Sequence, residues 1–426
     1  MKPRQLLSYS KSIGTYFVAS FIPMLLMALI NPLIAMNMSP EDYAVYGYYN
    51  SFTALISPLI VFYMLHYYSK RYFEVSEEER YRLKAMLFKA LIFFSMAVAA
   101  VCLVLLALYI YVFNSDLEFP VFPYLAIMVF AIPFTGIYKL EQTECRMSRD
   151  SRGFFRITMA AGLLLVAANL FFVVAVKWGA LGKLLAPLAA NACVFIYLVI
   201  RHREFFRVRF NWSDFRHTLT FCLPLAAGAM LGYFSNGYDR TYLEGLGNIT
   251  EYGYYIVGAQ IAGYLNVFST AITSTFQPDI YESIARHDRR GLWRTCIMQV
   301  GLIAAVIIVF IIACPLIVKL LTAGRYEEST IYARIISVSV VTSAIYYVIN
   351  NYTIAKGYPR LYLYTTVIGS VLTVAAYPPA VRCSGFIGGA SMTGISFVLM
   401  AAVNVFLLLL VSFLERRRSG RRDLNK

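Results

Sequence analysis

Two adjacent residues of opposite charge, Asp239 and Arg240, stand near the end of a hydrophobic run that begins at Leu219. A charged side chain costs roughly 2.5–3.5 kcal/mol at the centre of a membrane helix, and less near the interface. Such a pair is tolerated where it faces a water-filled cavity, a substrate or a partner helix. The alternative is that both charges lie in the headgroup layer and only end the helix.

These two side chains could bind charged groups. Arg240 would form charge-assisted hydrogen bonds with an anionic group, and Asp239 would orient the arginine or carry a proton or cation. Lys89 and Lys139, near the inner ends of two other apolar runs, would add positive charge. The simpler interpretation of both lysines is that their amino groups reach the lipid headgroups.

Uncharged polar and aromatic residues complete the candidate binding set. Asn31, Asn50 and Asn236 fall within or next to apolar runs, where an asparagine lines a cavity or hydrogen-bonds one helix to another. The chain has 33 tyrosines, and an aromatic face can stack on a sugar ring, so Tyr255 joins the set. A belt of tyrosines at the membrane interface explains most of them equally well.

No catalytic or metal-binding pattern accompanies these residues. The seven cysteines form no CxxC pair, and the four histidines have no carboxylate or second histidine at ligand spacing. No phosphate-binding glycine loop, nucleophile elbow or HExxH sequence occurs. We therefore expect neither an enzyme nor a metal site.

The elements that position the candidate residues are membrane helices. Of 426 residues, 59% are hydrophobic and 14% are charged, with a mean hydropathy of +0.63, whereas a soluble chain has about 25% charged residues. Apolar runs of about 18 residues or more recur throughout, each long enough to cross the hydrocarbon core. This predicts an all-α integral membrane protein. The expected spans are residues 13–36, 44–65, 85–113, 120–138, 157–176, 184–200, 219–241, 252–276, 295–321, 331–355, 361–381 and 388–413.

The distribution of basic residues predicts the orientation of these twelve spans. With both termini in the cytoplasm, 30 of the 38 Lys and Arg residues fall in cytoplasmic segments and six fall in outer segments. The net charge of +15 is thereby explained by topology and contact with anionic lipids, so no nucleic-acid partner is expected.

An internal repeat divides the chain into two halves of six spans. The sequence DYAVY at residues 42–46 matches EYGYY at 251–255, an offset of 209. GALG at 179–182 matches GFIG at 385–388, an offset of 206. Because six is even, both halves have the same orientation, a plan common among transporters with a site at the interface between halves. We predict an N-terminal lobe over residues 1–210 and a C-terminal lobe over 211–426, around a central cavity.

The chain resembles the polysaccharide flippases, a family of lipid-linked oligosaccharide exporters for O-antigen and exopolysaccharide that shares a superfamily with the multidrug extruders. The lipid II exporter branch usually has two more spans than this chain. The residues that carry the resemblance are Asp239-Arg240-x-x-Leu243, Gly247, Gly253-Tyr254-Tyr255, Ser39-Pro40-Glu41-Asp42-Tyr43, Gln277-Pro278-Asp279 and the Gly385/Gly388 turn.

The resemblance implies transport in a bacterial cytoplasmic membrane. The cargo would be an oligosaccharide on a polyprenyl diphosphate, moved by alternating access to the outer leaflet during lipopolysaccharide or exopolysaccharide biosynthesis. A polysaccharide polymerase and glycosyltransferases would be its partners besides the bilayer. No cofactor is implied, and coupling to a proton or sodium ion stays open.

Two other functions compete with this interpretation. A cation-coupled drug or metabolite antiporter of the related branch would share the spans and lobes, although paired carboxylates would be expected deep in the first or seventh span. A membrane enzyme acting on polyprenyl-linked sugars would need long outer loops with reactive residues, and the expected outer loops are short.

Overall fold

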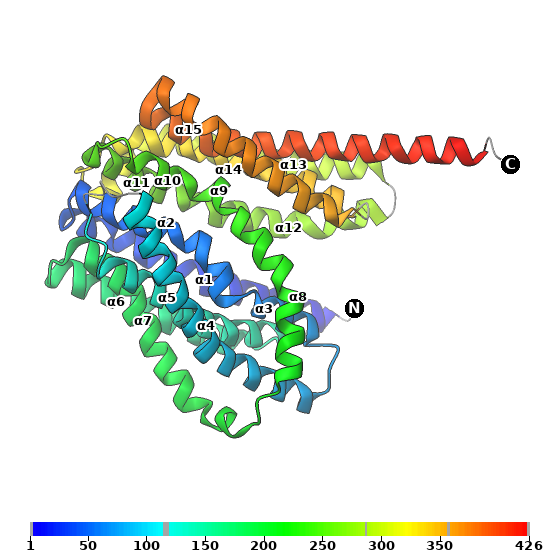
Figure 1. Ribbon diagram of the computed structural model, residues 1–426, viewed down its shortest axis with the longest axis horizontal. Coiled ribbons are helices and arrows are strands. Elements are labelled where there is room, and N and C mark those ends of the chain that lie inside the picture. The colour runs from blue at the N-terminus through cyan, green and yellow to red at the C-terminus, as the bar shows by residue number, and fades with distance from the viewer. Residues whose placement is uncertain (1–2, 114–118, 286–287, 356–357, 424–426) are drawn as a thin grey trace. The chain divides into compact units, whose positions relative to one another are not determined.

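A computed structural model describes residues 3–113, 119–285, 288–355 and 358–423 (Figure 1). These parts of the chain are helical, with no strand among them. Two compact units are present: unit 1 comprises Met1–Met230 with Leu321–Arg325, and unit 2 comprises Leu231–Leu320 with Tyr326–Lys426. The predicted division into lobes over residues 1–210 and 211–426 stays a prediction.

Unit 1 contains the first eight α-helices and two short helices of other types. The helices are α1 (Pro3–Met36), α2 (Pro40–Val61), α3 (Met64–Arg71), α4 (Glu77–Phe113), α5 (Tyr124–Met147), α6 (Ser151–Asn169), the π-helix η1 (Leu170–Ala175), α7 (Gly179–Arg201), the 3-10 helix η2 (Arg203–Arg207) and α8 (Trp212–Leu231), whose last residue belongs to unit 2.

Unit 2 contains the remaining helices, in which α14 packs along α15 and α11 packs along α14. The helices are α9 (Tyr233–Asn236), α10 (Tyr238–Glu244), α11 (Ile249–Gly263), α12 (Leu265–Ala285), α13 (Arg289–Thr322), α14 (Ser329–Ala355) and α15 (Pro359–Asp423).

These helices confirm the predicted fold class. Seven helices in the described residues are long and apolar enough to cross a membrane, and the bent pair α2–α3 would be an eighth. The other spans are shorter or interrupted: α1 has a short apolar part over Phe21–Met36, while Gly385 at φ 54° divides α15. With α8–α10 and α11–α12 each counted as one broken span, the helices follow the twelve expected spans.

The repeated sequences start equivalent helices. Ser39 and Asp42 form a reciprocal capping box at the start of α2, with backbone-to-side-chain distances of 3.0 and 3.1 Å. In unit 2, Asn248 caps α11 by accepting from the amide of Glu251 at 3.1 Å. Both acidic residues also reach a later helix: Asp42 accepts from the amide of Ala180 at 2.9 Å, and Glu251 accepts from the Tyr332 hydroxyl at 2.7 Å.

The expected seventh span is broken rather than continuous. Gly232 separates α8 from α9, and Gly237 separates α9 from α10. Broken helices at membrane depth are tolerated where the freed backbone is buried in protein or lines a cavity. The second break places Asp239 and Arg240 in the first turn of α10.

Candidate functional site

Asp239 is a buried carboxylate with a tyrosine partner. Its residue surface is 6% exposed, and it accepts a hydrogen bond from the hydroxyl of Tyr255 on α11. A buried carboxylate needs such partners, because burial removes the water that would otherwise stabilise its charge. Two residues of the predicted set, 16 residues apart on consecutive helices, therefore meet in unit 2.

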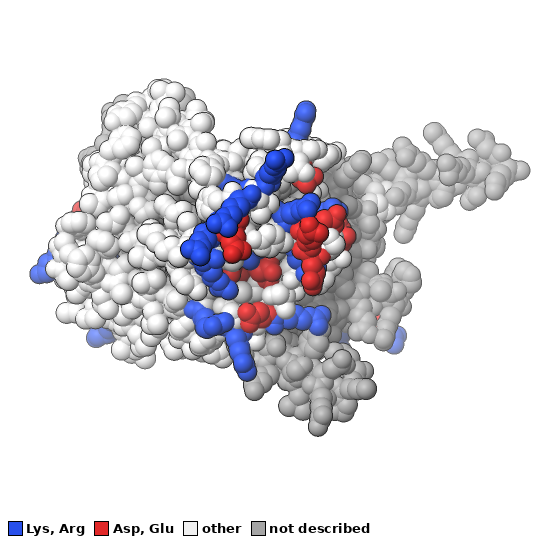
Figure 2. Space-filling model, turned by 90° about the horizontal axis from the view of Figure 1, so that it is seen from below, with Lys and Arg blue, Asp and Glu red and all other residues white. Residues whose placement is uncertain are grey.

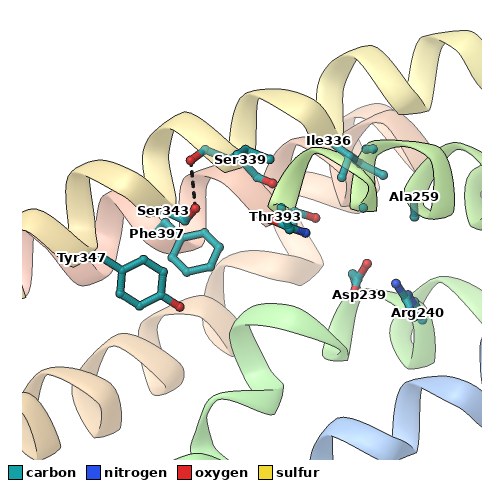
Figure 3. Close-up of a pocket in the computed structure, with 13 residues that line it drawn as sticks. Asp239, Arg240, Ala259, Ile336, Ser339, Ser343, Tyr347, Thr393 and Phe397 are labelled. Atoms are coloured by element: carbon teal, nitrogen blue, oxygen red, sulfur yellow. Dashed lines mark hydrogen bonds between the residues drawn. The ribbon is translucent and has the colours of Figure 1, made fainter. Parts of the chain in front are cut away.

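Asp239 and Arg240 line a cavity of about 180 Å³ inside unit 2, which we call the polar pocket (Figure 3). Its walls come from α10, α11, α12, α14 and α15. The rings of Tyr347 and Phe397 line it together with the two charged residues. The remaining lining residues are Ala259, Ala262, Gly263, Asn266, Ile336, Ser339, Val340, Ser343 and Thr393.

The polar pocket offers oxygen and nitrogen ligands of several kinds. Asp239 supplies a carboxylate, and Ser339, Ser343 and Thr393 supply hydroxyl groups. Such oxygen donors suit a hard cation or a proton, whereas Arg240 suits an anion. Among the described residues, no group of three or more His, Cys, Asp and Glu side chains could hold a metal ion.

A second group of charged residues lies in unit 1, on α3 and α5. His66 and Lys70 are exposed one turn apart on α3, and Lys139 and Arg146 are exposed two turns apart on α5. The side chains of His66 and Lys139 both lie close enough to Arg146 for electrostatic interaction. We call these four residues the basic face.

The contacts of the basic face are with aromatic and hydroxyl groups. The His66 ring stacks on Tyr63 with centroids 4.6 Å apart, and Lys70 Nζ lies 4.4 Å from the centre of the Phe221 ring. Arg146 Nη2 donates to the Thr143 hydroxyl at 3.1 Å. Within the described part of the chain, no carboxylate forms an ion pair with any of the four residues.

The basic face belongs to a unit with many charged residues near the ends of its helices. Figure 2 shows Lys, Arg, Asp and Glu gathered on one face of the molecule. Most charged residues in segments 70–82, 146–156 and 201–216 are exposed. Carboxylates and cations are interspersed over most of this region. The basic face differs from it because none of the described carboxylates forms an ion pair with its residues.

Four residues of the predicted set lie elsewhere. Lys89 is buried in unit 1, where its amino group donates to the Val208 carbonyl. Asn31, also in unit 1, donates to the carbonyl of Leu321 at 2.8 Å. Asn50 is half-buried on α2, and the side chain of Asn236 lies outside the described residues. The structure thus brings together Asp239, Arg240 and Tyr255, while Lys139 belongs to the basic face.

Sequence reasoning missed the hydroxyl groups of the polar pocket and three members of the basic face, His66, Lys70 and Arg146. Ser339 and Ser343 are spaced four residues apart, which places them on one side of α14, but serines are common in membrane helices. Lys70 and Arg146 resemble ordinary topology signals in the sequence.

The fold is similar to those of several solved transporters. The fold resembles that of the lipid II flippase MurJ in an inward closed conformation, with 14% identity, a TM-score of 0.70, and coverage of 92% of this chain and 87% of that chain. It also resembles an inward-facing multidrug resistance MATE family transporter of the MOP superfamily, with 15% identity, a TM-score of 0.69, and coverage of 94% and 99%.

A third structure is a MOP superfamily transporter from Pyrococcus furiosus, with 14% identity, a TM-score of 0.61, and coverage of 97% of this chain and 99% of that chain. Identities this low show a shared fold. No curated protein matches the chain. A family model described as polysaccharide biosynthesis protein matches residues 38–331, which is most of the sequence. The chain therefore belongs to this polysaccharide biosynthesis protein family.

Proposed function

We propose that this protein is a flippase that moves a polyprenyl-diphosphate-linked oligosaccharide from the cytoplasmic to the outer leaflet of a bacterial cytoplasmic membrane. It would act by alternating access during biosynthesis of a surface polysaccharide such as O-antigen or exopolysaccharide. The observation that carries the proposal is the basic face, where four basic residues on membrane-associated helices form no ion pair with any carboxylate among the described residues.

The chemistry of a diphosphate fits these four residues. Lys139 and Arg146 carry like charges close enough to repel each other, and an anion bound beside them would offset that repulsion. Lysine and arginine both bind phosphate oxygens through charge-assisted hydrogen bonds. Under the predicted topology this face lies toward the cytoplasmic side, where the cargo would be loaded.

A polar surface beside the basic face would suit the sugar. Gln142, between Lys139 and Arg146 on α5, donates to the hydroxyls of Tyr138 at 2.6 Å and Thr158 at 2.9 Å. Gln142 and Tyr138 are partly exposed, and hydroxyl and amide groups of this kind can exchange hydrogen bonds with a saccharide.

The polar pocket would bind the ion whose gradient drives transport. In this proposal Asp239 carries a proton or a sodium ion, with hydroxyl oxygens of the pocket completing its coordination, and Arg240 responds to the charge change. A polymerase and glycosyltransferases would act after and before the transport step, since the cargo must be assembled inside and polymerised outside.

A test in proteoliposomes would examine transport directly. A fluorescent polyprenyl diphosphate disaccharide would be incorporated, and its exposure to a membrane-impermeant quencher would be followed with and without the protein. We expect the protein to accelerate exchange between leaflets, and Lys139→Ala with Arg146→Ala to remove the acceleration. Equal exchange with and without the protein would refute the proposal.

A cation-coupled multidrug or metabolite antiporter is the second candidate. It is favoured by the acidic residue in the polar pocket and by the fold shared with MATE transporters. The same vesicles would distinguish the two functions, because an antiporter would move a cationic dye against an ion gradient and leave the lipid-linked sugar in place.

A further inference from the structure

The connection between α2 and α3 is a sharp bend built from two bulky residues. The axes of α2 and α3 differ by 49°. Phe62 and Tyr63 lie at the bend with φ values of 50° and 53°, in the left-handed region that residues with a Cβ rarely adopt. Neither residue is a glycine or an asparagine, so contacts elsewhere must hold this conformation.

The short helix α3 has one buried side and one exposed side. Met64 and Tyr68, one turn apart, are both 0% exposed. His66 and Lys70, also one turn apart, are exposed and belong to the basic face. The same eight-residue helix thus packs into the interior of unit 1 and presents half of the basic face.

The buried side of α3 is tied to a cluster of ion pairs. The Tyr68 hydroxyl donates a hydrogen bond to the carboxylate of Glu144 on α5. Glu144 in turn lies 3.9 Å from Lys84 Nζ, and Lys84 pairs with Glu141 at 3.0 Å.

The cluster is a firm attachment point because it joins three further helices. Besides Lys84 of α4, Glu141 of α5 contacts Arg201 at 3.5 Å and His202 at 3.2 Å, at the end of α7. The side chain of Glu141 is only 7% exposed, so these contacts are shielded from water and screened little by salt.

We propose that Tyr68 and Glu144 form a latch that holds α3 against the α2–α3 bend and thereby positions His66 and Lys70 beside Lys139 and Arg146. When the latch opens, α3 continues the direction of α2 and the basic face separates into two halves. Tyr68 and Glu144 are positioning residues in this proposal, which rests on the anion-binding role of the basic face given above.

The size of the movement follows from helix geometry. The eight residues of α3 span about 12 Å at 1.5 Å per residue, so removal of a 49° bend would displace its far end by about 10 Å. A displacement of that size would carry Lys70 several ångströms away from its position on the basic face, farther than a hydrogen bond to a bound phosphate could stretch. The latch would therefore control the affinity for a diphosphate.

The experiment measures position and binding in the same full-length protein. Spin labels at Phe73, just after α3, and at Ser148, just after α5, are placed on a background in which the seven cysteines are replaced. Pulsed electron resonance gives the distance between the labels, and calorimetry with inorganic pyrophosphate gives binding. Tyr68→Phe removes only the hydroxyl, and Tyr67→Phe is the matched control, since Tyr67 contacts Phe221 through its ring.

We expect Tyr68→Phe to add a population with a changed distance of several ångströms and to weaken pyrophosphate binding about tenfold, with Tyr67→Phe unchanged in both. Glu144→Gln, which keeps an acceptor but loses the charge, should give a smaller change in the same direction. Lys139→Ala should weaken binding without any change in distance.

Three results would contradict the proposal. An unchanged distance in Tyr68→Phe and Glu144→Gln would refute the latch while leaving the basic face intact as a binding site. A changed distance with unchanged pyrophosphate binding would refute the positioning role. No pyrophosphate binding by the unsubstituted protein would refute the anion site itself, and with it the proposed function on which the latch depends.

Discussion

The two halves of the repeat place opposite charges against equivalent tyrosines. In unit 2, Tyr255 donates its hydroxyl to the acid Asp239. The equivalent tyrosine of unit 1, at the offset of 209, is Tyr46, and its ring lies 5.5 Å from the amino group of the base Lys183. Lys183 is itself only 6% exposed and also lies 5.3 Å from the ring of Tyr43.

The charged residues themselves have no counterparts in the other half. Arg240 corresponds to Asn31, which binds a backbone carbonyl, and Lys183 corresponds at the offset of 206 to Gly389, which packs against Leu243. A tyrosine accepts either neighbour, because its hydroxyl donates to a carboxylate and its ring face attracts a cation. The repeat therefore preserves the aromatic framework while the charges that give each half its role have diverged.

The largest expected effect is the loss of export on substitution of Arg240, compared with substitution of its repeat counterpart Asn31. Arg240→Ala should abolish export of surface polysaccharide, because it removes the only cation that lines the polar pocket, all of whose lining residues are described. Asn31→Ala is the matched control and should retain export, since it loses one hydrogen bond worth about 1 kcal/mol. Both would be measured by surface glycan staining in cells with equal amounts of protein in the membrane. A wild-type amount of surface glycan in Arg240→Ala would show that export does not depend on Arg240 more than on Asn31.

The next effect concerns stability and compares a buried carboxylate with an exposed one. Glu141→Gln leaves the buried Lys84 with only the more distant carboxylate of Glu144, removes the charged partner of the partly buried His202, and should destabilise the protein by about 3 kcal/mol. Glu327→Gln breaks a 3.9 Å pair with Lys319 in which both side chains are more than half exposed, and should cost less than about 1 kcal/mol. Denaturant unfolding in detergent would give both values, and similar values would show that the buried cluster is not a firm attachment point.

A smaller effect tests the two equivalent tyrosines. Tyr255→Phe removes a hydrogen bond to a charged group, a contribution of about 1.5–3 kcal/mol, so transport should fall about tenfold or more. Tyr46→Phe keeps the ring that faces Lys183 and should change transport by less than about twofold. The proteoliposome assay checks both, and equal losses would mean that the two tyrosines act alike.

The mildest substitutions test the orientation that both halves are predicted to share. Cysteines at Trp178 and Ile387, next to the equivalent turns, should react with an impermeant reagent from outside, and a cysteine at Arg203 should react only from inside. The turn glycines themselves are poor positions, because a Cβ would lie 2.8 Å from the Phe172 carbonyl at Gly182 and 2.1 Å from the Ala380 carbonyl at Gly388. Labelling of Arg203 from outside would overturn the topology.

Much of the fold could be predicted from hydropathy because a membrane helix needs a long apolar run, and the twelve expected runs correspond to helices or broken helices. The break at Gly237 was not predicted, although Ser235-Asn236-Gly237 is a turn signal, because the run from Leu219 to Phe234 is long enough to suggest one continuous helix. The bend at Phe62 and Tyr63 has no local signal either, because bulky residues are not expected in the left-handed region.

The candidate site was predictable where a charge was conspicuous and unpredictable where packing decided the contact. Asp239 and Arg240 stand out by type alone. The hydrogen bond from Tyr255 to Asp239 depends on the angle at which the consecutive helices α10 and α11 meet. The hydrogen bond from Lys89 to the Val208 carbonyl depends on packing between segments 119 residues apart. The basic face required the α2–α3 bend, which brings α3 to α5.

The capping carboxylate Asp42 has a consequence for the order of assembly during synthesis. Its partner amide, that of Ala180, lies 138 residues later in the chain. At about 5–20 residues per second, a ribosome needs roughly 7–28 s to make that stretch. In unit 2 the repeat counterpart of Asp42, Glu251, is tied to a helix at a different place in the repeat: its contact with Tyr332 on α14 spans 81 residues and requires roughly 4–16 s. During biogenesis α2 is therefore without its contact to α7 for longer than α11 is without its contact to α14. In the meantime Asp42 can already form its capping-box hydrogen bonds with Ser39.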